Sequence, residues 1–107
     1  MDKIIPLYNI ETLPGKNYEA IGLVKGSMIQ SKHVGRDIGN ALKSLVGGEL
    51  RGYSEMLNEA RAIATKRMVL EAEAMNADAV VNIRYATSAV MQGAAEMLVW
   101  GTAVKFV

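Results

Sequence analysis

Residues 49–75 read ELRGYSEMLNEARAIATKRMVLEAEAM, and this stretch decides the fold. It contains no proline, one glycine near its start and many residues that favour helices. We therefore predict a single helix over 49–75, which at about 1.5 Å per residue would be roughly 40 Å long. Such a helix is longer than a small domain needs to cover one sheet.

The apolar residues of this helix fall into two stripes on a helical wheel. The first stripe should face a core, and its members with their flanking residues are Leu50, Leu57, Ala64, Met68, Met75, Tyr53, Ala60 and Ala72. The second stripe is Met56, Ile63 and Leu70, more than about 100° away from the first. Covering one sheet requires only the first stripe. The second stripe therefore predicts either packing under a neighbouring helix or contact with another copy of the chain.

Upstream of the helix the sequence predicts short extended pieces and a second, shorter helix. Residues 4–12 form a strand and 13–15 a Leu-Pro-Gly turn. Residues 18–24 form another strand, with a weaker extended piece at 27–30 beyond a Lys-Gly break. Residues 34–46 carry apolar positions three and four apart and end at two glycines, which indicates a helix.

Downstream of the helix two strands are predicted, after a left-handed helix end at Asn76. The first strand covers 79–86, and strict alternation would place on one side Ala79, Val81, Ile83 and Tyr85. The second covers 97–107 and is apolar on both faces, as in a strand that is buried on both sides. Gly101 interrupts it, and a glycine there predicts that another backbone or a bulky side chain approaches closely.

Two surfaces thus carry more apolar residues than a small two-layer domain can bury: the second helix stripe and the second face of the last strand. Exposed apolar patches of this kind mark contacts between proteins. We therefore expect a homo-oligomer, and Ile63 is expected to lie at a subunit contact.

Composition bounds the class of protein. The 107 residues fit one domain, 1–107, half of them hydrophobic and 21% charged. The net charge of +1 removes the electrostatic argument for a nucleic acid or an anionic membrane as partner. No apolar run reaches the roughly 18–20 residues of a membrane span, and there is no signal-peptide pattern at the start. With no cysteine, the expected location is the cytoplasm.

The side chains available for chemistry are few. With no cysteine and one histidine, His33, the chain offers neither a usual transition-metal site nor a serine–histidine–acid triad. The seven methionines are best explained by packing. Arg67 and Glu71, one helical turn apart, predict a partly buried ion pair. We assign no catalytic residue and no metal ligand, and no cofactor is identified.

Several short motifs follow one another along the chain: GLVKG at 22–26, GGE at 47–49, EAR at 59–61, NADAVV at 76–81 and GTAV at 101–104. Between the second and fourth of these, the pattern also includes Tyr53, Leu57, Ala64, Arg67, Met68, Glu71 and Ala72. In this order the motifs resemble the YbjQ-like family of small bacterial proteins over nearly the whole chain. The resemblance implies an α+β, dodecin-like fold: a small sheet packed by one long and one short helix, with extra short strands. It also implies subunits joined in a ring, often a pentamer, and a heavy-metal-binding label that the cysteine-free chain does little to support.

Three functions remain open. The first is a non-catalytic homo-oligomer whose pore or subunit crevice binds a small ligand or ion. The alternative is a small enzyme with a site assembled between subunits, in which one chain supplies Glu71, Arg61 or Arg67 and another supplies a polar residue such as Asn82 or Arg84. A scaffold that binds another protein is the third. The remaining ligand or interface candidates lie on the last strand and are Trp100, Gly101 and Thr102.

Overall fold

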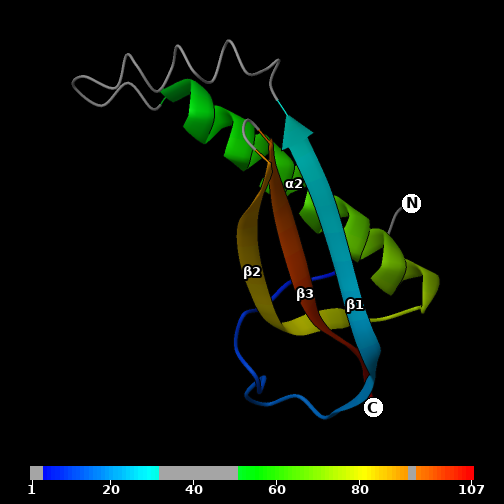
Figure 1. The fold of residues 1–107 in the computed structure, drawn as a ribbon. Helices are drawn as coiled ribbons and strands as arrows, with labels where there is room; N and C mark the ends of the chain where they lie inside the picture. Colours follow the sequence, from blue (N-terminus) through cyan, green and yellow to red (C-terminus); the bar gives the residue numbers. More distant parts are fainter. Residues whose placement is uncertain (1–3, 32–50, 92–93) are drawn as a thin grey trace.

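The structure, a computed structural model, describes residues 4–31, 51–91 and 94–107. Its elements in chain order are β1 (Tyr18–Ser31), α2 (Arg51–Ala74), β2 (Ala79–Met91) and β3 (Ala94–Phe106). The strands form an antiparallel sheet in the order β1-β3-β2, and α2 crosses one face of it (Figure 1). The protein is therefore a small α+β fold, as predicted. The short helix predicted over 34–46 lies outside the described residues.

The long helix is confirmed, with ends close to those predicted. Its C-terminal end is fixed by Asn76, whose φ of 58° is left-handed. The Ala77 N–H donates to the Ala72 carbonyl at 3.0 Å, and the Asn76 N–H donates to the Glu73 carbonyl at the same distance. These two bonds form a Schellman motif, which satisfies carbonyls that would otherwise be left unpaired at the helix end. None of the helices in the described part of the chain is long and apolar enough to cross a membrane.

The face that α2 turns to the sheet differs from the predicted stripe. Its buried residues are spaced by four and are Met56, Ala60, Ala64, Met68 and Ala72. Leu57 is only half-buried and Met75 is 39% exposed, so their assignment to the core was wrong. The helix crosses the sheet obliquely (Figure 1). The contact therefore follows the i, i+4 ridge of the helix, whereas a helical wheel assumes that the contact runs parallel to the helix axis. Met56 consequently belongs to the chain's own core and not to a second stripe.

β1 is one continuous strand, although the sequence predicts a break at Lys25-Gly26. Gly26 lies inside the strand because the backbone of α2 passes directly over it. A Cβ atom at this position would overlap the Ala64 carbonyl oxygen and would lie 2.6 Å from the Met68 nitrogen. Gly26 is thus required by the close packing of α2 on β1 and does not mark a turn.

β2 contains a bulge at Asn82, and this corrects the predicted faces of the strand. The register shifts between Val81 and Arg84, and the φ of Asn82 is 56°. Before the bulge, Ala79 and Val81 pack on the face away from α2; after it, Ile83 joins the core under α2. An extra residue in one strand reverses the alternation, which sequence periodicity alone cannot reveal.

β3 is the central strand, and only one of its faces is fully covered. Met97, Val99 and Ala103 are buried under α2. On the other face Val104 is buried, while Leu98 and Trp100 are half-buried. The prediction of burial on both faces therefore holds for only part of the strand within one chain.

The segment before β1 covers one end of the second face. Instead of the strand predicted over 4–12, it forms an isolated parallel bridge between Leu7 and Val80. Backbone bonds tie it to β2, among them Tyr8 N–H to the Val80 carbonyl at 2.9 Å. Leu13 then packs with Val104 in a second, smaller core. The predicted turn is confirmed by the Lys16 N–H to Leu13 carbonyl bond, and Gly15 has a φ of 76°.

Candidate functional site

The predicted site residues fall into two groups that the fold separates. Arg61, Arg67 and Glu71 project from α2, whereas Arg84, Trp100 and Thr102 belong to the sheet. Register pairs Trp100 with Lys25 on one side and Arg84 on the other, so these three residues form a row across the sheet. The enzyme hypothesis takes these two groups from different subunits, and within one chain they lie on different elements.

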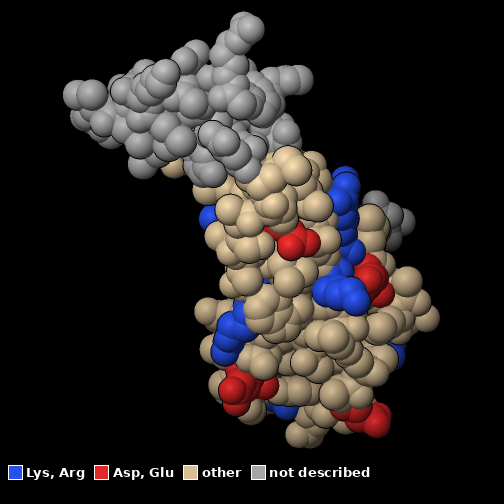
Figure 2. Space-filling view, viewed as in Figure 1, with Lys and Arg blue, Asp and Glu red and all other residues tan. Residues whose placement is uncertain are grey.

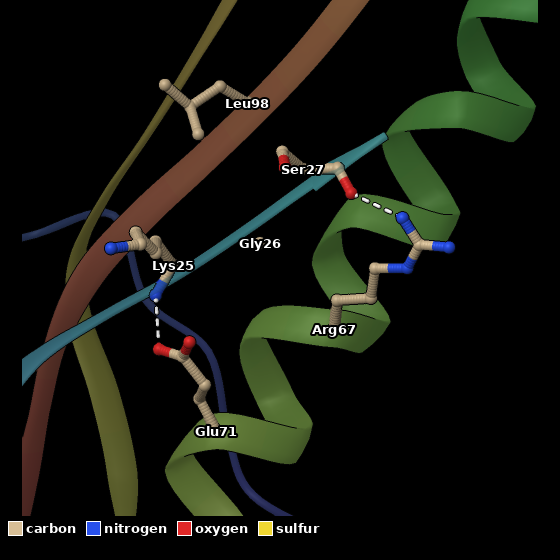
Figure 3. Close-up of a pocket in the computed structure, with 6 residues that line it drawn as sticks. All are labelled: Lys25, Gly26, Ser27, Arg67, Glu71 and Leu98. Atoms are coloured by element: carbon tan, nitrogen blue, oxygen red, sulfur yellow. Dashed lines mark hydrogen bonds between the residues drawn. The ribbon is translucent and has the colours of Figure 1, made fainter. Parts of the chain in front are cut away.

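Arg67 and Glu71 bind the backbone of β1 (Figure 3). The Arg67 Nη1 donates to the Ser27 carbonyl at 2.7 Å, and the Glu71 Oε1 accepts from the Lys25 N–H at 3.0 Å. The predicted partly buried Arg67–Glu71 ion pair is wrong on both counts: the side chains are exposed, and among the described residues no ion pair joins them. Each finds a better partner in an unpaired backbone group of the neighbouring strand.

A shallow groove of about 300 Å³ follows this side of β1. Its lining residues are Lys25, Gly26, Ser27, Arg67, Glu71 and Leu98. Arg61 lies apart from it, because its Nη1 donates to Asn58 Oδ1 at 2.8 Å within the helix. The sequence had placed Arg61 and Arg67 in equivalent roles, and only Arg67 reaches the sheet.

On the face of the sheet away from α2, the row Lys25–Trp100–Arg84 lies among apolar residues. Leu23 is 62% exposed and Ile29 is 57% exposed, and register places them beside Thr102 and Glu96 of β3. Leu23 and Ile29, together with the half-buried Leu98 and Trp100, form what we call the open face. Figure 2 shows the molecule from this side as mostly uncharged surface on which acidic and basic side chains are scattered. Sequence reasoning missed Leu23 and Ile29, although their even spacing of six residues, which places both on one face of a strand, was visible.

Arg84 is held against the segment before β1. Its Nη1 donates to the Asn9 carbonyl at 2.8 Å and to the Ile83 carbonyl at 2.9 Å. A guanidinium has five N–H donors, so this contact orients the group without exhausting it. The cation is thus fixed at one end of the row that contains Trp100.

Gly101 and Asn82 meet at the bulge. A Cβ at Gly101 would lie 2.7 Å from Val80 Cγ1 and 3.1 Å from the Val81 carbonyl oxygen, so the predicted close approach is confirmed. The Asn82 N–H donates to the Ile10 carbonyl, but its Oδ1 is buried without a hydrogen-bond partner. These two residues shape β2 and β3 and do not line the open face.

The described residues contain no group of three or more histidine, cysteine, aspartate or glutamate side chains that could hold a metal ion. Asp78 instead accepts from the Phe106 N–H at 2.9 Å and lies 4.0 Å from Lys105 Nζ. His33 lies outside the described residues. The described residues thus present two candidate surfaces. One is the open face, which is apolar and carries cationic groups. The other is the edge of β1, where Arg67 and Glu71 bind backbone groups.

The comparisons with known proteins agree with the resemblance noted in the sequence. A family model named YbjQ_1, described as "Putative heavy-metal-binding", matches residues 5–107. The chain belongs to the YbjQ family. Two YbjQ relatives are named UPF0145 proteins: one from Clostridium novyi is 67% identical over 99 residues, covering 92% of this chain and 96% of its own. The other, from Alkaliphilus metalliredigens, is 63% identical over 101 residues, covering 94% and 98%.

A crystal structure from Pediococcus pentosaceus, of a protein of unknown function in the DUF74 family, has a similar fold. The TM-score is 0.65 over 96% of this YbjQ chain and 98% of that chain. At 13% sequence identity the likeness concerns the fold alone. The UPF0145 names state no activity for the YbjQ relatives.

Proposed function

We propose that this protein is a cytoplasmic, non-catalytic homo-oligomer, a dodecin-like ring such as a pentamer, which holds a small ligand or ion between subunits. The observation that carries the proposal is the open face. Leu23, Ile29, Leu98 and Trp100 leave apolar surface on the face of the sheet away from α2. In a single domain such a contiguous patch is unfavourable in water and marks a contact with another protein.

A second copy of the chain is the occupant that the charge favours. The formal net charge is +1, so two copies approach each other with little long-range repulsion. Cyclic or other closed symmetry then repeats one contact in every subunit and leaves no face open. Repetition also turns one side chain per subunit into a ring of identical groups, which is how a chain whose described residues contain no metal-binding cluster can still hold a ligand.

The ligand class follows from the row across the sheet. Lys25 and Arg84 place cationic groups on either side of Trp100, which is half-buried. When another subunit covers the open face, these cations lose water and need an anionic partner. A small carboxylate or phosphate that contacts the indole ring satisfies this arrangement better than a soft metal ion, which prefers thiolates or several imidazoles.

Native mass spectrometry of the purified protein tests the proposal, because it gives the subunit count and the mass of any retained ligand together. We expect a single closed oligomer. Leu23→Glu places a charge in the contact and should dissociate it. The control is Ala62→Glu on the exposed side of α2, which should leave the assembly intact. A clean 11.6 kDa monomer for the unmodified protein would contradict the proposal.

A further inference from the structure

β1 is an edge strand of the described sheet, paired only with β3. The outer side of such a strand presents a row of N–H and C=O groups to which a strand from another chain can bond. β1 has 14 residues, so this edge is long, and its middle lies at Lys25–Ser27. Proteins that keep such an edge from pairing with other chains must cover it or charge it.

Two side chains of α2 cover this part of the edge. Glu71 supplies an acceptor to the Lys25 N–H at 3.0 Å, and Arg67 supplies a donor to the Ser27 carbonyl at 2.7 Å (Figure 3). These are the two kinds of group that the backbone of an added strand would offer. The side chains therefore occupy the same positions that a fourth strand would need.

The spacing of helix and strand makes this match possible. Four residues along a helix cover about 6 Å, and two residues along a strand cover about 6.8 Å. Arg67 and Glu71 are four residues apart, whereas Lys25 and Ser27 are two apart, so the two pairs face each other along the edge. Gly26 lies between the bonded groups and lets the helix backbone come close enough for short contacts.

The opposite edge of the sheet is covered in a different way. There the segment before β1 bonds to β2, with the Asn82 N–H donating to the Ile10 carbonyl and the Ile83 N–H to the Tyr8 carbonyl. Backbone covers the Val80–Ile83 part of one edge, and a pair of opposite charges covers the middle of the other. An added strand would also remove water from these charged side chains, and this desolvation costs free energy.

We propose that Arg67 and Glu71 guard the β1 edge against addition of an extended strand, first of all the β1 strand of a second copy of this chain. The guard prevents association at this edge. It goes beyond the proposed function and does not depend on it, because the open face and the β1 edge are different surfaces.

The test compares two double variants with equal changes in charge. Arg67→Ala with Glu71→Ala removes the guard, and alanine preserves the helix. Arg61→Ala with Glu73→Ala is the control: both residues are exposed on the same helix, and the bond from Arg61 to Asn58 stays within α2. The first readout is amide hydrogen exchange at Lys25, which should become about tenfold faster in the guard variant, as expected for loss of one charge-assisted bond. The control should not change it.

The second readout is the lag time of aggregation, followed by thioflavin fluorescence well below the melting temperature. We expect a lag several-fold shorter in the guard variant than in the control. Val99→Ala, a truncation in the buried core, reports what lost stability alone does, and all proteins are compared at the same interval below their melting temperatures. Equal lag times in guard variant and control, or a shortening no greater than that of Val99→Ala, would overturn the guard. If the double variant does not fold, the single variants Glu71→Ala and Glu73→Ala are compared in its place by the same lag-time and Lys25 exchange measurements. The subunit count of the unmodified protein tests self-association separately.

Discussion

Gly26 and Gly22 are two glycines of β1 with different surroundings. A Cβ at Gly26 would overlap backbone atoms of α2, which cannot move without shifting the whole helix. We therefore expect Gly26→Ala to lower the free energy of unfolding by about 3 kcal/mol, the upper end for overpacking. The corresponding loss in melting temperature is more than about 10 °C in a domain of this size. Thermal denaturation followed by circular dichroism measures it.

Gly22→Ala is the matched control for that experiment. A Cβ there would lie 3.8 Å from the Met75 Cε, an ordinary contact with the end of a flexible side chain. The change should leave the melting temperature within a few degrees or raise it slightly, since alanine loses less conformational entropy than glycine on folding. Equal melting temperatures for the two variants would contradict the close approach of helix and strand.

Gly101→Val tests the other close approach. Valine favours strands, yet its Cβ would lie 2.7 Å from Val80 Cγ1 and 3.0 Å from Ile83 Cγ1. We expect a loss of about 1–3 kcal/mol in unfolding free energy, measured by denaturant titration. An unchanged or higher stability would mean that β2 yields easily at its bulge.

At the scale of residues, the sequence could predict Gly101 but not Gly26. Gly101 interrupts an apolar strand, so its lack of a side chain needs a reason. Gly26 follows a lysine, and the pair reads as a break between two extended pieces. Its role depends on where α2 crosses β1, and this crossing is a long-range property that no local pattern contains.

At the scale of elements, α2 and the final strand were predictable because long runs of helix formers and continuous apolar residues are strong local signals. The face of α2 was not, because the crossing angle selects which ridge is buried. The two halves of β2 were assigned to one face because a bulge leaves no regular trace in the sequence. For the candidate site, Arg67 and Glu71 were found but not their partners, which are backbone groups.

The bulge in β2 leads to a prediction about Asn82. This residue has a left-handed φ of 56° and a buried Oδ1 without a partner. Asn82→Gly removes both costs, so we expect the stability to stay equal or to rise by up to about 1 kcal/mol. Asn82→Ala keeps a Cβ in the left-handed region and should be less stable than the glycine variant by about 1–2 kcal/mol. Chemical denaturation of the pair measures this, and the reverse order would refute it.

At the scale of the whole molecule, a second apolar surface remains on α2. Ile63 is half-buried and Leu70 is 54% exposed, whereas Met56 belongs to the core. Ile63→Glu, which the sequence suggested as a probe of assembly, would therefore also disturb folding. Leu70→Glu is the cleaner change, because Leu70 is exposed in the single chain. If this stripe of α2 takes part in the proposed ring, we expect the variant to dissociate without losing helix content. Light scattering measures the dissociation, and circular dichroism measures the helix content. An unchanged mass would restrict the contact to the open face.

The family description leads to a prediction about metals. With no cysteine and one histidine in the chain, we expect no tight site for a transition metal. Calorimetric titration of chelator-treated protein with zinc, copper(I) and cadmium should detect at most weak binding. A stoichiometric site of submicromolar affinity that disappears in His33→Ala would contradict this expectation.

The position of β3 between β1 and β2 determines when the sheet can form during synthesis. β3 follows the other two strands in the chain, yet it is the one that joins them. On the ribosome, β1 and β2 emerge before their common partner, and the pairing of Tyr18 with Phe106 must wait until β3 has been made. The sheet can therefore form only after β3 has been synthesised, and it requires closure of long loops, which slows folding. During this interval a nascent chain carries two strands that have not yet been paired, and it is then most dependent on chaperones.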